Sequence, residues 1–236
     1  MHLAQQGTQE GVVVLTDNQT AGKGRQGRRW QDIAGCSVLS SIILRPHFSA
    51  YLLVMIASLA VVDAIAESSA VQATIKWPND VLIQDRKVAG ILIETSRDRL
   101  GQLIAIMGIG VNANGSPVQT AMPSLQATTL AAACGHEVSR EELIAHLLKH
   151  VEDMYQTLQQ EAQDPLPNEG TSLSQQIRTR WRSQLSTLGR SIQVRQGDTI
   201  LSGVAEDVDE NGELFLRDHC GKRVSITWGD VGYPTE

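Results

Sequence analysis

Four cationic side chains and three glycines alternate in a short stretch near the start of the chain. The glycines occupy positions 22, 24 and 27, and the cations are Lys23, Arg25, Arg28 and Arg29. Glycine lets the backbone approach a ligand closely and adopt positive φ. Consecutive backbone N–H groups combined with fixed cations form a receptor for phosphate or another polyanion. The stretch therefore predicts an anion-binding loop, with an ordinary solvated basic loop as the alternative.

Two familiar phosphate-binding motifs do not describe this loop. The Walker spacing Gly-x-x-x-x-Gly-Lys-Ser/Thr is absent, and no helix is expected directly after the glycines, as a dinucleotide fingerprint requires. A different kind of anion site is indicated.

Three further clusters combine special residues with the ends or interiors of expected strands. They are Lys76-Trp77-Pro78-Asn79-Asp80, then Gly90-Ile91-Leu92-Ile93-Glu94 with Lys87 just before it, then Gly108-Ile109-Gly110-Val111-Asn112. A glycine within a strand allows a bulge or a close approach of backbone to ligand. Taken singly, each cluster also has an ordinary structural explanation as a turn or a relief of packing.

Composition excludes several classes of protein. The chain has 236 residues, 42% of them hydrophobic and 19% charged, with a net charge of −6. This suits one globular domain with a smaller partner and argues against global disorder. An acidic chain with 4% aromatic residues is poorly suited to nucleic acid, which needs bulk positive charge or stacking surfaces. No nucleic-acid partner is expected.

The cysteines and apolar segments predict a cytoplasmic protein without a membrane span. Cys36, Cys134 and Cys220 are odd in number and far apart, which argues against a disulfide framework or a thiolate zinc site. The longest apolar run, residues 51–66, is shorter than the ~18–20 residues that cross a bilayer. The N-terminus has no basic-then-apolar signal pattern.

The elements that must position these clusters follow from apolar patterning. A buried strand is expected at 11–16, a long loop at 17–36, and a second strand at 37–44. An almost uncharged helix at 50–67 is expected to pack on a sheet, and further strands at 73–77, 81–83, 88–95 and 103–111. These alternations predict a β-sheet flanked by helices.

The second half of the chain changes character. Helices are expected at 128–133, 139–161 and 172–188, with a loop at 164–170 and a capping box from Ser139 to Glu142. Short strands follow at 191–195, 201–207, 213–217 and 222–228, with a tight Asn211-Gly212 hairpin turn. The prediction is an α+β protein: a domain with a mixed sheet over 1–188, and a small β-barrel over 189–236.

Taken together and in this order, the four clusters resemble the motifs of the biotin–protein ligases. Residues 19–30 are similar to the family's ligand-binding loop, and 76–80 to its lysine motif. Residues 90–94 are similar to its biotin-side strand and 108–112 to its nucleotide-side strand. Residues 203–231 resemble its SH3-like C-terminal domain. The resemblance implies a class II synthetase/biotin ligase-like catalytic domain.

The resemblance also implies a reaction. Such a ligase joins the carboxylate of biotin to the α-phosphate of ATP, with Mg²⁺ accompanying the ATP, and releases pyrophosphate. It then transfers biotin from biotinyl-5′-AMP to a lysine of a biotin carboxyl carrier protein domain. Because both reactants of the first step are anions, charge neutralisation and positioning are what the residues must supply.

The resemblance assigns roles to particular residues. Lys76, Arg25 and Lys23 are expected to be catalytic, with Lys76 bridging carboxylate and phosphate. Biotin is expected to contact Gln19, Gly22, Arg25, Lys76, Gly90 and Ile91. ATP is expected to contact Lys23, Arg25, Arg28, Trp30 and Asn112. No metal-ligating side chain is expected, because a water-facing helix surface accounts better for Glu142, His146 and His150.

The sequence departs from the family pattern in two places. Lys23 stands where arginine is usual, which keeps the charge but loses a bidentate fork. The Ser-Thr-Asn segment expected roughly twenty residues before the glycine loop does not occur in residues 1–11. The sequence therefore predicts an N-terminally truncated catalytic domain of the monofunctional type, without a DNA-binding domain.

Other interpretations stay open at this point. A lipoate ligase or octanoyltransferase would share the catalytic fold, and an inactive biotin or biotinyl-AMP-binding protein would explain the missing segment. An unpaired strand edge would permit a homodimer or docking of the acceptor by strand addition.

Overall fold

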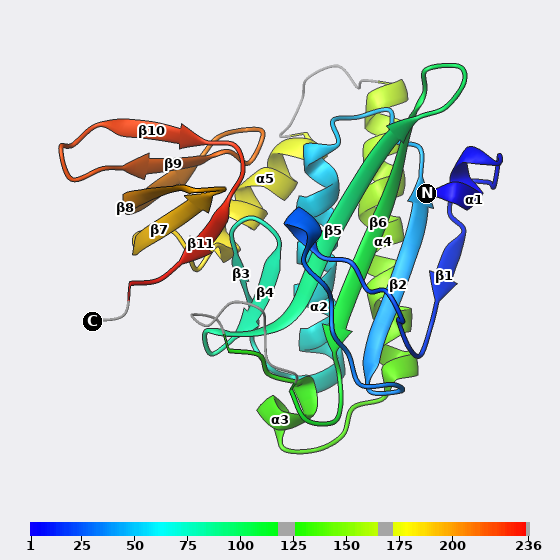
Figure 1. Cartoon of the computed structure of the whole chain (residues 1–236). Coiled ribbons are helices and arrows are strands. Elements are labelled where there is room, and N and C mark those ends of the chain that lie inside the picture. Colours follow the sequence, from blue (N-terminus) through cyan, green and yellow to red (C-terminus); the bar gives the residue numbers. More distant parts are fainter. Residues whose placement is uncertain (118–125, 165–171, 235–236) are drawn as a thin grey trace.

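The computed structural model describes residues 1–117, 126–164 and 172–234, which form a large and a small β-sheet with helices (Figure 1). The large sheet has the order β1-β2-β6-β5-β4-β3. Its strands are β1 (Val13–Leu15), β2 (Ser37–Leu44), β3 (Thr74–Lys76), β4 (Asp80–Ile83), β5 (Arg86–Arg97) and β6 (Leu103–Asn112). The loop predicted at 164–170 lies almost entirely outside the described residues.

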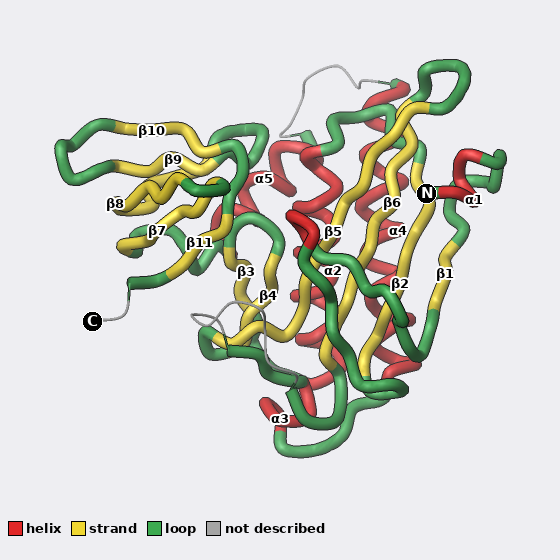
Figure 2. Tube along the Cα trace, viewed as in Figure 1, coloured by secondary structure: helices red, strands yellow, loops and turns green. Residues whose placement is uncertain are grey.

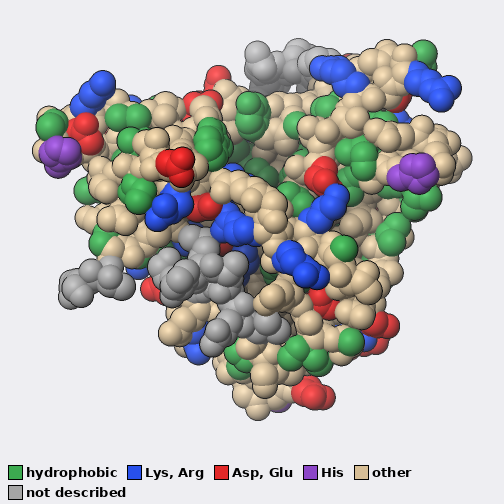
Figure 3. All heavy atoms as spheres, in the orientation of Figure 1, with side chains coloured by type: hydrophobic (Ala, Val, Ile, Leu, Met, Phe, Trp, Pro, Cys, Tyr) green, Lys and Arg blue, Asp and Glu red, His purple; other side chains and the backbone are tan. Residues whose placement is uncertain are grey.

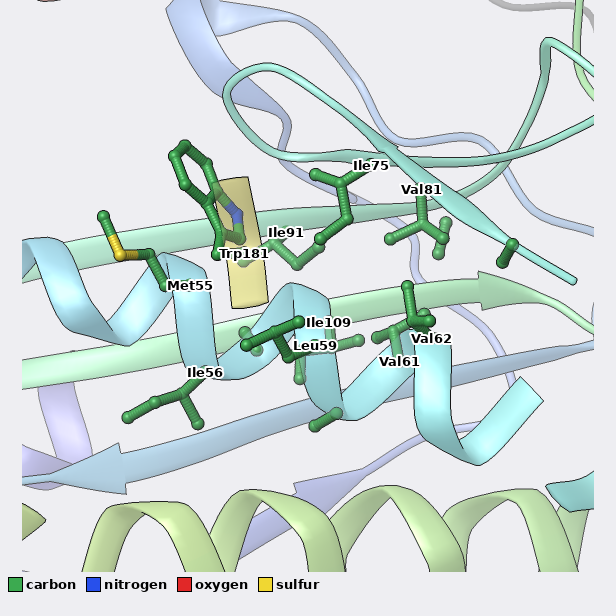
Figure 4. Packing of buried hydrophobic residues seen from close by; sticks show 14 of the residues in the cluster. Met55, Ile56, Leu59, Val61, Val62, Ile75, Val81, Ile91, Ile109 and Trp181 are labelled. Carbon is green, nitrogen blue, oxygen red and sulfur yellow. The ribbon is translucent and has the colours of Figure 1, made fainter. Parts of the chain in front are cut away.

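One long helix covers a single face of the large sheet. This helix, α2 (Tyr51–Ser69), is buried along most of its length because it lies between the sheet and two further helices. Figure 4 shows Met55, Ile56 and Leu59 of α2 among side chains of the sheet and Trp181. The nearly uncharged sequence of α2 is therefore explained by contacts on several sides.

Helix α2 is also long and apolar enough to cross a membrane by length and composition alone, which corrects the estimate from the sequence. However, 67% of its most apolar window is buried inside the protein, as in the core helix of a globular fold.

The remaining helices frame the sheet. They are α1 (His2–Gln5), α3 (Leu130–Cys134), α4 (Arg140–Gln163) and α5 (Leu173–Gln184). The predicted cap of α4 is present, because the Ser139 hydroxyl accepts a hydrogen bond from the backbone N–H of Glu142. Figure 1 shows α2 and α4 on one side of the sheet, and the loop after β1 crossing the other side.

The C-terminal strands form the small sheet, in the order β10-β9-β8-β7-β11 (Figure 2). They are β7 (Ser191–Gln196), β8 (Thr199–Val208), β9 (Leu214–Arg217), β10 (Arg223–Ile226) and β11 (Asp230–Gly232). Trp77 joins the two parts: its backbone N–H donates to Thr187 Oγ1 at 3.0 Å and its indole N–H to the Gly212 carbonyl at 2.8 Å. Contacts of this kind hold the small sheet against β3.

The α+β fold class is confirmed, and four details differ from expectation. Strand β1 is an exposed edge rather than a buried strand, with Val14 44% and Leu15 47% exposed. All strand pairs among the described residues of both sheets are antiparallel, so the large sheet is not mixed. Strand β11 was not predicted, because three residues carry too little pattern. At the β8–β9 hairpin only Gly212 has positive φ (+80°), so the two-residue Asn-Gly turn is replaced by a longer one.

One buried hydroxyl in the core gives a stability prediction. The Ser58 hydroxyl accepts from the Trp181 indole N–H at 3.0 Å, and both residues are almost inaccessible. Ser58→Ala leaves that indole N–H buried without its partner, so we expect the free energy of unfolding to fall by about 1–3 kcal/mol. Urea denaturation measures the change.

Ser69→Ala is the matched control for Ser58→Ala. Ser69 also lies on α2, and its hydroxyl, like that of Ser58, donates to the carbonyl four residues earlier at 2.7 Å, but no buried donor of the described residues bonds to it. We expect its loss to cost about 0.5 kcal/mol or less. Equal losses in the two variants would contradict the role assigned to Ser58.

Candidate functional site

A cavity of about 760 Å³ lies on the face of the large sheet opposite α2. Strand register explains its floor, because residues directly opposite in an antiparallel pair share a face. One row across the sheet runs Leu39, Gly110, Gly90 and Asp80. The next row runs Val14, Ser41, Gly108 and Leu92. Glycine at three central positions removes the side chains that would otherwise fill this face.

Trp30 lies directly on the glycine floor. A Cβ added to Gly110 would stand 2.7 Å from the indole ring of Trp30, and one added to Gly90 would stand 3.0 Å from it. A Cβ on Gly108 would meet nothing closer than 3.4 Å. The indole N–H of Trp30 is buried and has no hydrogen-bond partner among the described residues. Gly90 and Gly110 thus admit an aromatic ring, and Gly108 leaves open space beside it.

The predicted glycine loop forms the outer wall of the cavity. It folds back on itself through a bridge between Lys23 and Arg29, around the short turn η1 (Arg25–Gly27). Gly22 allows the two arms of the loop to approach each other closely, because a Cβ on Gly22 would lie 2.6 Å from the Trp30 carbonyl oxygen. Gly22 faces an adjoining hollow of about 600 Å³ between the loop and β5 rather than the main cavity.

The cations of the site each have a partner within the protein. Arg25 donates to Asn79 Oδ1 at 2.9 Å, and Arg28 donates to the carboxylate of Asp230. Lys23 Nζ lies 3.6 Å from Glu94, and Lys87 Nζ lies 2.6 Å from Asp80. In Figure 3, Lys and Arg side chains gather at the centre of this face. Burial lowers the pKa of Arg25, which Asp230 opposes; an arginine starts so high that it stays charged.

Lys87 enters the site through an irregularity in the sheet. Val81 pairs with Ala89 and Leu82 with Lys87, so β5 carries one extra residue at this point. A bulge re-aims side chains, and here it brings Lys87 to the face of Gly90, from which simple alternation would exclude it. Its ammonium lies 5.6 Å from the centre of the Trp30 ring.

Lys76 is placed differently from Lys87. It pairs with Asp80 at the outer end of the first row, but it is only 2% exposed and does not line the cavity. Its ammonium lies 5.3 Å from the centre of the Tyr233 ring, which also stacks on Arg190. Burial lowers the pKa of Lys76 to about 8, and nearby Lys87 adds to that effect while Asp80 opposes it.

The structure brings together most of the residues predicted for the site. The cavity is lined by Gln19, Lys23, Arg25, Arg28, Trp30, Gly90, Ile91 and Asn112. Gly22 and Lys76 lie outside this lining. Sequence reasoning assigned no role to four further lining residues: Lys87, Asn79, Asp80 and Asp230. Of these, Lys87, Asn79 and Asp80 belong to clusters already noted, whereas Asp230 had no local signal.

Two amides fix the geometry of the cavity rim. The Asn79 side chain donates to the Ile91 carbonyl at 2.7 Å, and the Ile91 N–H donates back to the Asn79 carbonyl at 2.9 Å. The Asn112 amide donates to the Thr128 carbonyl at 3.1 Å. Among the described residues, no group of three His, Cys, Asp or Glu side chains is arranged to hold a metal ion.

Fold and cavity together define an α+β protein with a cation-lined cavity on a glycine-floored sheet. The profile of the biotin/lipoate A/B protein ligase family matches residues 1–112, and the profile of the biotin protein ligase C-terminal domain matches residues 187–231. A biotin–[acetyl-CoA-carboxylase] ligase of Paracoccus denitrificans is 34% identical over 89% of this chain and 86% of its own length. The chain belongs to the biotin–protein ligase family.

Other proteins match most of this chain in sequence or in fold. The bifunctional ligase/repressor BirA of Bacillus subtilis is 33% identical over 93% of this chain, which spans 65% of that relative's length. The biotin protein ligase of Aquifex aeolicus, solved in complex with biotin and ATP, superposes with a TM-score of 0.79 at 25% identity. That likeness covers 99% of this chain and 94% of the other.

The buried Lys76 gives a pH-dependent prediction. Because its pKa is about 8 in the folded chain against an ordinary 10.5, the unfolded chain binds more protons between these two values. Stability therefore rises with pH across that window, by about 3 kcal/mol for this residue. Urea denaturation at pH 7.5, 9 and 10.5 should show this rise in the wild type but not in Lys76→Met.

Lys222→Met serves as the control for that measurement, because Lys222 is an exposed lysine in the turn between β9 and β10. It should keep the rise of the wild type. Identical pH dependence in the wild type and in Lys76→Met would contradict the lowered pKa of Lys76.

Proposed function

We propose that this chain is an ATP-dependent biotin–protein ligase, which forms biotinyl-5′-AMP and transfers biotin to a lysine of a biotin carboxyl carrier protein domain. The observation that carries the proposal is that one cavity combines an apolar surface with a cationic one. A floor without side chains, walled by Leu39, Leu92 and Ile106, suits an apolar fused ring. The cations of the loop and Lys87 suit the anions that must meet beside it.

In the first step, an oxygen of the biotin carboxylate attacks the α-phosphorus of ATP. The bond between the α-phosphorus and the bridging oxygen breaks, and pyrophosphate leaves with the electron pair. Lys87 is the residue best placed to neutralise the reacting anions, since it lines the cavity beside Gly90. Charge that is already positioned lowers the barrier without reorganisation. The role that the sequence suggested for Lys76 passes in this proposal to Lys87.

The loop cations would hold the phosphates. Arg25 is oriented by Asn79, and Arg28 and Lys23 lie on either side of it in the loop. Trp30 would lie against the adenine, and Asn112 would serve the nucleotide from the far end of the floor. Gln19, Gly90 and Ile91 would bound the biotin, and Gly22 would act indirectly, by letting the loop approach Trp30.

In the second step, the amine of the acceptor lysine attacks the acyl carbon of biotinyl-AMP. AMP leaves with the electron pair of the carbon–oxygen bond, and the attacking nitrogen loses a proton. Enclosure by the loop would protect the adenylate from water until the acceptor arrives. We place this reaction in the cytoplasm, and the proposed boundary between the catalytic and C-terminal domains lies at residues 188–189.

Mg²⁺ would arrive with ATP and screen the charge of the leaving pyrophosphate. Mg²⁺ is commonly held by substrate phosphates with one or two carboxylates. The cavity offers Asp80 and Asp230 near its cations, which fits a phosphate-borne ion better than a protein-held one.

Biotin-dependent exchange of labelled pyrophosphate into ATP tests the first step directly. We expect exchange with biotin and not with lipoate, and a loss of about 100-fold or more in Lys87→Met, the size typical of removing one positioned charge. Lys222→Met should match the wild type.

The same assay separates the alternatives. Exchange with lipoate instead of biotin would support a lipoate ligase, and biotin binding without exchange would indicate an inactive binding protein. Full exchange in Lys87→Met together with none in Lys76→Met would return the catalytic role to Lys76.

A further inference from the structure

One of the three acidic side chains that line the cavity comes from the small sheet. Asp230 begins β11 of the small sheet, yet its carboxylate lines the cavity of the large sheet. Among the lining residues it is the one contributed by the small sheet. Its side chain is 15% exposed, so it is held in the site rather than extended into solvent.

Asp230 faces the arginines of the glycine loop. Its carboxylate accepts a hydrogen bond from the Arg28 guanidinium, and its charge does more than that of any other carboxylate to raise the pKa of Arg25. The other two cavity acids pair with lysines, Asp80 with Lys87 on the neighbouring strand and Glu94 with Lys23. Asp230 alone among these three joins the loop to the C-terminal part of the chain.

A half-buried arginine without a counter-ion is unfavourable, because it loses water and gains nothing in return. A carboxylate offers a guanidinium two acceptor oxygens, as a phosphate does. Phosphate and Asp230 therefore compete for the same donors of Arg28. Both cannot use them fully at once.

We propose that Asp230 is a positioning residue that occupies the phosphate place on Arg28 in the empty site and yields it when the nucleotide binds. The inference rests on the proposed function, since it assumes that the cavity receives phosphates. It also couples ligand binding to the C-terminal domain, because binding of phosphate releases one of the contacts that hold the glycine loop to the small sheet.

The remaining contacts keep the small sheet in place during this exchange. Trp77 stays bonded to Gly212 and Thr187, and Tyr233 stays against Lys76 and Arg190. The exchange therefore changes the contacts of the glycine loop, which loses its bond to Asp230 when phosphate binds Arg28.

Calorimetric titration with inorganic pyrophosphate tests the proposal without requiring catalysis. Asp230→Asn keeps the shape of the side chain and removes its charge, so we expect pyrophosphate to bind about threefold to tenfold more tightly. Asp230→Glu should restore weaker binding. Glu206→Gln is the control, because Glu206 pairs with Arg217 and Arg223 in the same sheet but does not line the cavity.

A double-mutant cycle removes the ambiguity of a damaged fold. Damage to the site would weaken binding, whereas the proposal requires a gain. In an Arg28→Gln background the gain from Asp230→Asn should be smaller, since the Arg28 guanidinium is no longer there to be released, whereas Arg25 still feels the charge of Asp230.

Unchanged or weaker binding in Asp230→Asn, beside a wild type that binds pyrophosphate, would overturn this inference and leave the proposed function standing. A wild type that binds no pyrophosphate would overturn both.

Discussion

The absence of side chains at the centre of the large sheet is the constraint on which the rest of the structure depends. Gly90, Gly108 and Gly110 open one face of the sheet, so that face contributes little to the core. The opposite face must then supply most of the packing, and α2 provides it. An isolated helix as apolar as α2 would expose a large apolar surface to water, but α4 and α5 cover it. The ligand cavity and the nearly uncharged helix are two consequences of one arrangement.

Electrostatics imposes a second requirement on the same face. A cavity that concentrates arginine and lysine must keep them neutralised when no ligand is present. Asp80, Glu94 and Asp230 meet this need. The net charge of −6 therefore conceals a local excess of cations, each held by a carboxylate or amide. The C-terminal sheet belongs to the site for this reason, because one of the carboxylates comes from it.

Sequence patterns predicted the elements well where apolar periodicity is strong. Strand β2 begins and ends at the expected residues, and α2 differs from its prediction by one or two residues at each end. The exposure of β1 was missed because an edge strand and a central strand have similar composition. Fold class followed from the order of elements and from the resemblance of motifs together.

The site was less predictable, for reasons that lie in its geometry. Alternation along β5 places Lys87 on the wrong face, and only the bulge opposite Val81 and Leu82 corrects it. Lys76 has the same side chain in a more recognisable motif, yet Tyr233 covers it from a distant part of the sequence. Asp230 could not have been assigned, because its contact with Arg28 joins residues far apart in the chain.

A crystal structure of this chain with biotin and ATP would test the central claim most directly. The account predicts the fused rings of biotin against Gly108, in the space beside Trp30, with its carboxylate and the α-phosphate meeting beside Lys87. Ligands bound away from this floor, or their reacting groups held by Lys76 with Lys87 turned aside, would contradict it.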